Sequence, residues 1–262
     1  MNAWIFDVDG VLSNLDARGI VEPSLFPSLE RILLQGDLLA FNTGRDTVWV
    51  RRHILEPLEK MGVDASLLKD VFLACEKGGT WQEADQEVQL NDAFVLPPLF
   101  VEKIKNIITD EFSDVMFFDD GKRTMISVEM KKGIARELFT PRQQELHQIF
   151  VKYLDEYGLS QKYFIQEDLI ASDIMHKNAG KDIGMQHILT WFELSNKHPE
   201  HFFCFGDNPS DLHMGELLQS KNYPFTFVYV GTKPLEPTSF VPILTEEKFD
   251  KGTASFLKTF DK

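Results

Sequence analysis

Residues 4–12 read WIFDVDGVL, an apolar run that ends in two carboxylates and a glycine. In extended backbone, side chains two residues apart point to the same side, so Asp7 and Asp9 can face one cleft. A strand that ends in an Asp/Gly turn is also common. The stretch therefore predicts a buried first strand. It leaves two interpretations of the carboxylates open, turn formation or the binding of a cation and catalysis.

Further short apolar segments alternate with amphipathic ones along the chain. The apolar segments have the length of buried strands, and they cover residues 3–8, 38–42, 71–75, 202–205 and 225–230. The amphipathic segments predict helices over residues 28–35, 47–61, 181–196 and 211–219. This alternation predicts an α/β fold with a mostly parallel sheet covered by helices. Polar residues follow several of these strands, where open α/β sheets place their ligands.

The middle of the chain has a different pattern, in which a helix and two strands occur twice. The first round is a helix at 97–111 and strands at 115–118 and 124–130 around a hairpin turn. The second is a helix at 140–157 and strands at 163–166 and 169–174. The repetition predicts a small α+β domain over 81–175, inserted into a core formed by 1–80 and 176–262.

Composition limits the classes of function. The chain has 262 residues, of which 43% are hydrophobic and 26% charged, as in ordinary globular proteins. Its formal net charge of −14 disfavours binding to nucleic acid or to an anionic membrane surface. Strand-like sequence from residue 4 and the lack of an apolar run of about 18 residues predict no signal peptide and no membrane span, so the expected location is cytoplasmic.

Two further motifs offer groups that could bind an oxyanion. Asn42, Thr43, Gly44 and Arg45 follow the apolar segment LLAF, and a hydroxyl with a glycine N–H at a strand end suits a phosphoryl oxygen. The alternative is an ordinary helix N-cap by Thr43. Lys181 begins a predicted helix, where the helix dipole disfavours a cation, which suggests that it faces concentrated negative charge. A solvated lysine is the alternative.

A fourth motif, GDNPSD at 206–211, follows the apolar segment FFCF. It carries Asp207 and Asp211, and carboxylates from neighbouring strand ends would build the oxygen-rich site that Mg²⁺ prefers. Capping of the next helix by Asp207 or Ser210 is the structural alternative. Each motif is weak alone, but their order and their shared position at strand ends favour one catalytic site.

The four motifs together resemble those of the haloacid dehalogenase superfamily of phosphohydrolases, whose core is Rossmann-like with three layers. The insert resembles the type II cap of Cof-like sugar phosphatases, of sucrose- and trehalose-phosphate phosphatases and of phosphomannomutases. EKGG at 76–79 resembles the ENG turn before that cap, with Lys77 in place of the usual Asn. KGTA at 251–254 is similar to the opening of their C-terminal helix, so the resemblance covers the whole chain.

The resemblance implies a catalytic role for each motif. Asp7 would be the nucleophile that forms an aspartyl-phosphate, and Asp9 would be the general acid and then the general base. Thr43 and Lys181 would bind the phosphoryl group, as would Gly44, Arg45 and Asn208, although contact of Arg45 with an internal carboxylate is the alternative. The cofactor would be Mg²⁺, held by Asp7, Asp207 and the backbone carbonyl of Asp9. Asp211 would support the metal through water or orient Lys181.

The function expected from this resemblance is a Mg²⁺-dependent phosphatase of a small metabolite, a sugar phosphate or a glycosyl-polyol phosphate. A sugar phosphomutase with the same aspartyl-phosphate chemistry is the alternative, and a binding module with a vestigial site is a third possibility. Substrate selection would fall to the cap, where Lys131, Lys132 or Arg136 could reach a second anionic group. The substrate and the oligomeric state are not predicted.

Overall fold

The computed structural model describes residues 1–14, 19–83 and 86–260. The chain forms two compact units, unit 1 from Met1–Gln89 with Gly180–Lys262 and unit 2 from Leu90–Ala179. The sequence-based bounds of the insert, 81 and 175, differ from these limits. Strand β4 (Thr80–Glu83) pairs with β3 (Val71–Cys75) in the sheet of unit 1, so the chain leaves that unit later than its apolar pattern indicates.

Within the described residues, unit 1 is built on an eight-stranded sheet. The strand order is β12-β11-β10-β1-β2-β3-β4-β5. Every pair from β12 to β3 is parallel, and β4 is antiparallel to β3. The bounds of the strands not yet given are β1 (Asn2–Phe6), β2 (Leu38–Asn42), β5 (Gln89–Leu90), β10 (His201–Gly206), β11 (Phe225–Tyr229) and β12 (Ile243–Leu244). The mostly parallel α/β core predicted from the sequence is confirmed.

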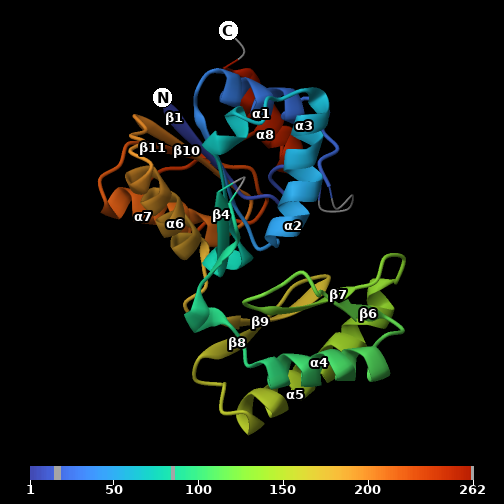
Figure 1. Cartoon of the computed structure of the whole chain (residues 1–262). Helices are drawn as coiled ribbons and strands as arrows, with labels where there is room; N and C mark the ends of the chain where they lie inside the picture. The colour runs from blue at the N-terminus through green and yellow to red at the C-terminus, as the bar shows by residue number, and fades with distance from the viewer. Residues whose placement is uncertain (15–18, 84–85, 261–262) are drawn as a thin grey trace. The chain divides into compact units, whose positions relative to one another are not determined.

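Both faces of this sheet are covered by helices, as Figure 1 shows. Successive side chains of β1 point to opposite faces. Trp4 and Phe6 therefore pack with α1 (Leu25–Leu34) and α8 (Phe249–Lys258), whereas Ala3 and Ile5 pack with the helices of the other face. These are α6 (Lys181–Leu194) and α7 (Leu212–Ser220). The result is a helix–sheet–helix core of three layers.

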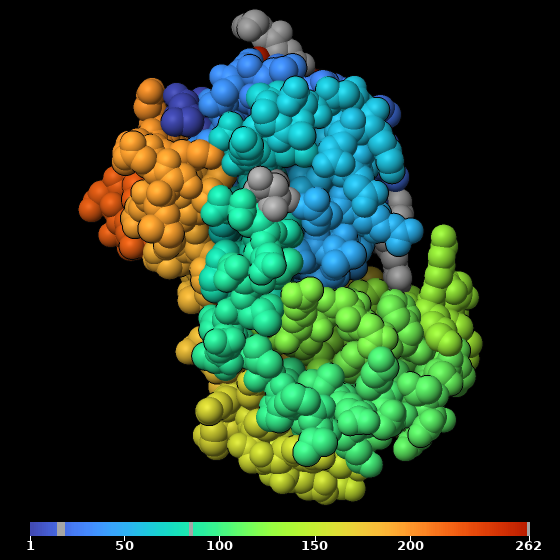
Figure 2. Space-filling view, in the orientation of Figure 1, coloured from blue at the N-terminus to red at the C-terminus, as the bar shows by residue number. Residues whose placement is uncertain are grey.

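The helix predicted over residues 47–61 is helical throughout but not uniform. It consists of α2 (Thr47–Val50), a π-helical segment at Arg51–Leu55 and α3 (Glu56–Met61). Hydrophobic periodicity does not distinguish one π turn from an α turn, so the sequence could not predict the change. These residues form a continuous light-blue part of the surface of unit 1 in Figure 2.

Unit 2 is an α+β domain with a core of its own. Its four-stranded sheet has the order β6-β7-β9-β8, from β6 (Met116–Phe118), β7 (Ile126–Met130), β8 (Tyr163–Glu167) and β9 (Ala171–His176), and its neighbouring strands are antiparallel. Helices α4 (Pro98–Glu111) and α5 (Arg136–Glu156) pack on one face. No helix in the described part of either unit is long and apolar enough to cross a membrane.

Candidate active site

The predicted site residues of unit 1 lie at one edge of its sheet. Strand β1 pairs in parallel with β10 on one side and with β2 on the other, so all three strands end at the same edge. The residues that follow them are Asp7, Asp207 and Thr43. Lys181, the first residue of α6, reaches the same place. Parallel pairing therefore brings together motifs that are far apart in the sequence.

Lys181 is the cation around which the site is arranged. Its Nζ lies 2.7 Å from Oδ1 of Asp7 and 2.9 Å from Oδ1 of Asp211, and the side chain is buried. The same Nζ donates a hydrogen bond of 2.7 Å to the backbone carbonyl of Asn42. A lysine at a helix N-terminus lies at the unfavourable end of the dipole, and these two carboxylates offset that cost.

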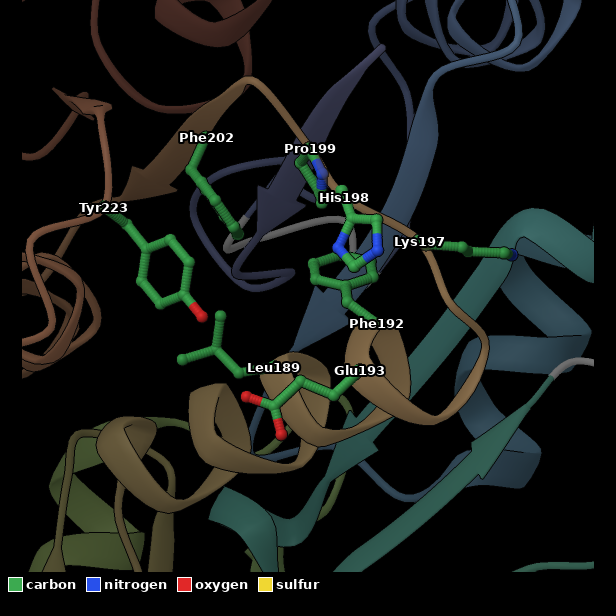
Figure 3. Close-up of a pocket in the computed structure, with 8 residues that line it drawn as sticks. All are labelled: Leu189, Phe192, Glu193, Lys197, His198, Pro199, Phe202 and Tyr223. Carbon is green, nitrogen blue, oxygen red and sulfur yellow. The ribbon is translucent and has the colours of Figure 1, made fainter.

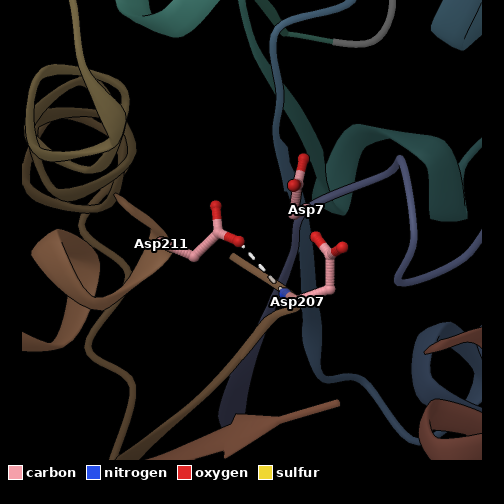
Figure 4. Close-up of side chains that lie close together, drawn as sticks. All are labelled: Asp7, Asp207 and Asp211. Carbon is pink, nitrogen blue, oxygen red and sulfur yellow. Dashed lines mark hydrogen bonds between the residues drawn. The ribbon is translucent and has the colours of Figure 1, made fainter. Parts of the chain in front are cut away.

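Three carboxylates lie close together, as Figure 4 shows, and two of them contact Lys181. One oxygen from each of Asp7, Asp207 and Asp211 lies within 4.8 Å of the others. Gly10 permits the arrangement, because a Cβ at that position would lie 2.4 Å from Oδ2 of Asp207. Its backbone is also left-handed, with φ of +75°, which favours glycine. The glycine of DVDG is therefore needed both for the turn and for the approach of Asp207.

The crowding of negative charge changes the protonation of the cluster. Burial raises the pKa of Asp7 to about 8, and the neighbouring Asp211 and Asp207 add to the shift, against the attraction of Lys181. Burial also raises the pKa of Asp207 to about 7, with Asp211 and Asp9 acting in the same direction. Burial lowers the pKa of Lys181, but the charges of Asp211 and Asp7 outweigh it and raise that pKa above its ordinary value. The cluster thus holds more negative charge than one lysine neutralises.

These shifts predict how the stability of the metal-free protein depends on pH. A carboxyl whose pKa is raised on folding binds its proton more tightly in the folded chain than in the unfolded chain. The folded state therefore loses stability as the pH rises and the proton is released. This loss of stability begins near pH 3.8, the ordinary pKa of an aspartate, and continues up to about pH 8 for Asp7 and about pH 7 for Asp207. The free energy of unfolding, measured by denaturation with a chelator, should fall by up to about 1.4 kcal/mol per pH unit per group.

The matched control for this titration is Asp207→Asn, which removes one of the two groups. Its free energy of unfolding should fall less between pH 5.5 and pH 8 than that of the wild type, and saturating Mg²⁺ should flatten the wild-type curve. Equal slopes in the two proteins would contradict the raised pKa of Asp207.

Asp9 lies apart from the cluster and pairs with Arg45. Nε of Arg45 donates to Oδ2 of Asp9 at 2.9 Å, and its Nη2 donates to Oδ1 at 2.9 Å. The guanidinium group also lies 4.9 Å from the ring centroid of Trp49. The sequence placed Arg45 among the phosphate-binding candidates. In the structure its guanidinium forms a bidentate ion pair with the second carboxylate of DVDG, as the internal-carboxylate alternative expects.

Thr43 is fully buried and does not cap the following helix. The N-cap of α2 is Asp46, whose side chain accepts a hydrogen bond of 2.9 Å from the N–H of Trp49. The N-cap alternative for Thr43 is therefore wrong. Its hydroxyl accepts a hydrogen bond of 3.1 Å from the N–H of Arg45, and among the described residues it donates to no acceptor. A buried hydroxyl with an available hydrogen, next to Gly44, suits an incoming oxyanion.

The loop of the fourth motif is held by its own side chains. Oδ2 of Asp211 accepts hydrogen bonds from the N–H groups of Asp207 at 3.1 Å and Asn208 at 2.9 Å. Asn208, rather than Asp207 or Ser210, is the cap of the helical turn at Pro209–Asp211, and its side-chain oxygen accepts from the N–H of Ser210. One oxygen of Asp211 contacts Lys181 and the other accepts from the loop, so these contacts favour a role in orienting Lys181 over direct metal binding. The side-chain oxygen of Asn208 already accepts a hydrogen bond within the loop.

Asn42 belongs to the second motif, but the sequence analysis assigned it no role in the site. It is fully buried at the end of β2, and its Nδ2 donates 2.8 Å to the backbone carbonyl of Lys181. Its own carbonyl accepts from Nζ of that lysine. The two residues therefore bind each other in both directions, which fixes the start of α6. An amide side chain in an otherwise apolar strand was the signal that could have identified it.

A cavity elsewhere in unit 1 is not part of this site. It has a volume of about 110 Å³ and is lined by Leu189, Phe192, Phe202 and Tyr223, with charged side chains at its margin (Figure 3). Phe202 lies at the start of β10, and Tyr223 precedes the start of β11. The cavity is therefore near the amino ends of the strands, at the edge of the sheet opposite to the carboxylates.

Comparison with solved structures shows the same fold over essentially the whole chain. The C-terminal domain of trehalose-6-phosphate phosphatase from C. albicans aligns with a TM-score of 0.67 and 14% identity, covering 98% of this chain and 91% of that one. A haloacid dehalogenase-like hydrolase from Bacteroides thetaiotaomicron aligns with a TM-score of 0.63 and 14% identity, with 99% of each chain covered. The fold expected from the four motifs is confirmed.

A third structure is that of sucrose-phosphatase from Synechocystis in complex with sucrose and phosphate. It aligns with a TM-score of 0.53 and 14% identity, covering 99% of this chain and 98% of that one. No protein-family model matches the chain, and no curated protein matches it in sequence. At these identities the likeness concerns the fold, so the chemistry has to be argued from the site.

Proposed function

We propose that this chain is a Mg²⁺-dependent phosphatase that hydrolyses a small phosphorylated metabolite through a phosphorylated Asp7. The observation that carries the proposal is the convergence of Asp7, Asp207 and Lys181 at one edge of the sheet, with Asp9 close by but outside the cluster. Phosphoryl transfer requires an aligned nucleophile and groups that neutralise the phosphoryl oxygens. This arrangement supplies both.

Asp7 is the nucleophile of the proposed reaction. A carboxylate oxygen attacks phosphorus, the bond to the leaving alcohol breaks, and an aspartyl-phosphate forms. Lys181, at 2.7 Å from Asp7, stabilises both the carboxylate and the charge on the phosphoryl group. The available hydroxyl hydrogen of Thr43 and the N–H of Gly44 would donate to phosphoryl oxygens.

Asp9 is the general acid in the first half-reaction and the general base in the second. It donates a proton to the leaving oxygen, then accepts one from the water that attacks phosphorus and restores Asp7. The bidentate contacts of Arg45 fix the direction of the Asp9 carboxylate, and packing against Trp49 orients the guanidinium group in turn. Arg45 is thus proposed as a positioning residue for Asp9.

The carboxylates suit a hard divalent cation. Their donor set is all oxygen, which Mg²⁺ prefers. Burial, and after it the neighbouring carboxylates, raises the pKa values of Asp7 and Asp207, and a bound cation would oppose both effects. Asp7 and Asp207, with the backbone carbonyl of Asp9, would hold the ion. When bound, Mg²⁺ would offset the repulsion between the nucleophile and the phosphate dianion.

The proposed substrate class is a sugar phosphate or a glycosyl-polyol phosphate. Structures with the same fold include a trehalose-6-phosphate phosphatase and a sucrose-phosphatase, and both align over both units of this chain. Unit 2 would act as the cap that selects the substrate. Three basic residues of unit 2 are candidates for contact with a second anionic group of the substrate. Lys132 and Arg136 are exposed, and Lys131 is half-buried.

The test is phosphate release from a panel of about a hundred phosphorylated metabolites. We expect release from at least one sugar phosphate with Mg²⁺, and loss of release with a chelator. An isomerised hexose phosphate with little free phosphate would identify a phosphomutase instead. A panel without turnover, together with no rise in melting temperature on addition of Mg²⁺ and beryllofluoride, would contradict the proposal.

A further inference from the structure

A short turn next to the site has an unusual backbone. The helical turn η3 (Glu76–Gly78) follows β3, and its three residues have φ of +49°, +53° and +81°. Glycine adopts this left-handed region freely, but Glu76 and Lys77 do so only at a cost. Such conformations persist where the surroundings determine them, and they concentrate at functional sites.

Backbone hydrogen bonds connect this turn to two of the four motifs. The N–H of Lys77 donates to the carbonyl of Thr43 at 3.0 Å, and the carbonyl of Lys77 accepts from the N–H of Gly180 at 2.8 Å. The N–H of Glu76 donates to the carbonyl of Arg45 at 3.0 Å. The backbone of Lys77 therefore connects the second motif with the residue that precedes Lys181. Its backbone position is fixed by the same segments that form the site.

The side chain of Lys77 lies over Gly44. It is half-buried, and its Cε lies 3.7 Å from the point where a Cβ on Gly44 would be. The ammonium group is one bond beyond that carbon. A second cation is thus held against the Thr43–Gly44 segment, where the oxyanion donors of the second motif lie.

The charge of the site gives this cation a role. Asp7, Asp9, Asp207 and Asp211 bring four carboxylates to this edge of unit 1. Lys181 and Arg45 are each engaged with these carboxylates, Lys181 with Asp7 and Asp211, and Arg45 with Asp9. A phosphate monoester adds close to two further negative charges. A lysine beside Gly44 offers positive charge on the side of the pocket that the second motif forms.

We infer that Lys77 is a second phosphoryl-binding lysine, which contacts the phosphoryl group of the substrate from the Thr43–Gly44 side. The inference rests on the proposed function and extends it. Because a charged donor binds an anion more strongly than a neutral one, phosphate binding should weaken when Lys77 is replaced by a neutral residue and should also weaken as the ionic strength rises.

Calorimetric titration of inorganic phosphate in the presence of Mg²⁺ tests this role. The variant Lys77→Asn removes the charge and should raise the Kd for phosphate about 10-fold or more, the range of a charge-assisted hydrogen bond. Lys77→Arg keeps the charge and should stay within about threefold of the wild type. The melting temperature of Lys77→Asn should not fall, because Asn adopts the left-handed region more readily than Lys.

The control is Lys221→Asn, which makes the same change of charge at an exposed residue after α7. Lys221 precedes β11 and thus lies near the amino ends of the strands, away from the site, so its variant should bind phosphate as the wild type does. If Lys77→Asn binds phosphate as tightly as the wild type, the inference is overturned and the proposed function stands. If Lys77→Asn and Lys77→Arg both melt early and bind weakly, the role of Lys77 is structural, which also overturns it. If the wild type neither hydrolyses a phosphomonoester nor binds phosphate, both fail.

Discussion

Replacement of Asp7 by Asn should abolish hydrolysis while leaving the fold intact. The amide has nearly the shape of the carboxylate but does not attack phosphorus, so kcat should fall by a factor on the order of 10⁴ or more. Stability should not suffer, because Asp7 is one of three crowded carboxylates and burial already raises its pKa to about 8. Phosphate release and thermal melting, measured on the same preparations, check both parts.

The matched control is Asp110→Asn, at an exposed residue of α4 in unit 2. It makes the same chemical change away from the carboxylate cluster and should retain the wild-type kcat. Turnover by Asp7→Asn within about tenfold of the wild type would show that another group attacks the phosphate, and the role given to Asp7 would be wrong.

Replacement of Lys181 by Gln should destabilise the protein as well as inactivate it. Lys181 is buried and lies within 3 Å of carboxylate oxygens of Asp7 and Asp211, so its loss leaves buried negative charge without a cation. Breaking a buried ion pair in this way costs about 3–5 kcal/mol. The free energy of unfolding of the metal-free variant at pH 8 should fall by about that amount, and kcat by about 10³-fold.

The pH dependence separates this electrostatic effect from lost packing. Near pH 5 Asp7 is protonated in the folded chain, because its pKa is raised to about 8, so the missing cation matters less and the loss of stability should be smaller. Lys221→Gln serves as the surface control at both pH values. An equal loss at pH 5 and pH 8 would indicate that Lys181 acts through packing rather than charge.

The main features of the site could be predicted because parallel strands end at a common edge. Once DVDG and GDNPSD are placed after buried strands, the proximity of Asp7 and Asp207 follows from topology alone. The position of Lys181 at a helix start also helped to predict the site. A cation at the unfavourable end of a helix dipole requires a local anion, and the structure supplies two.

Contacts made by long or ambiguous side chains could not be predicted. An arginine at residue 45 can reach a substrate oxygen or an internal carboxylate, and the sequence does not choose between them. The structure pairs it with Asp9. The helix caps were not predicted either, because short polar side chains near a helix start can cap it or face a ligand. Asp46 rather than Thr43 caps α2, and Asn208 rather than Asp207 or Ser210 caps the turn at Pro209–Asp211. Such choices depend on distances of a few tenths of an ångström, which a sequence pattern does not contain.

The antiparallel side of the sheet was harder to predict than its parallel centre. The segment TWQE of β4 has one apolar residue in four positions, and residues 81–83 were assigned to the insert. Its antiparallel pairing with β3 makes it part of unit 1. β4 carries little hydrophobic signal because its two buried residues, Thr80 and Gln82, are polar, whereas β1 to β3 are apolar on both faces.

The most direct test of the proposed chemistry is to trap the covalent intermediate. A substrate identified by the panel is mixed with the Mg²⁺-loaded enzyme and quenched in acid, and the protein is then digested and analysed by mass spectrometry. We predict one phosphoryl group on the peptide that contains Asp7, at an acyl-phosphate sensitive to hydroxylamine, and none in Asp7→Asn. Phosphate on a different residue, or active enzyme that transfers phosphate to water without labelling Asp7, would contradict the mechanism.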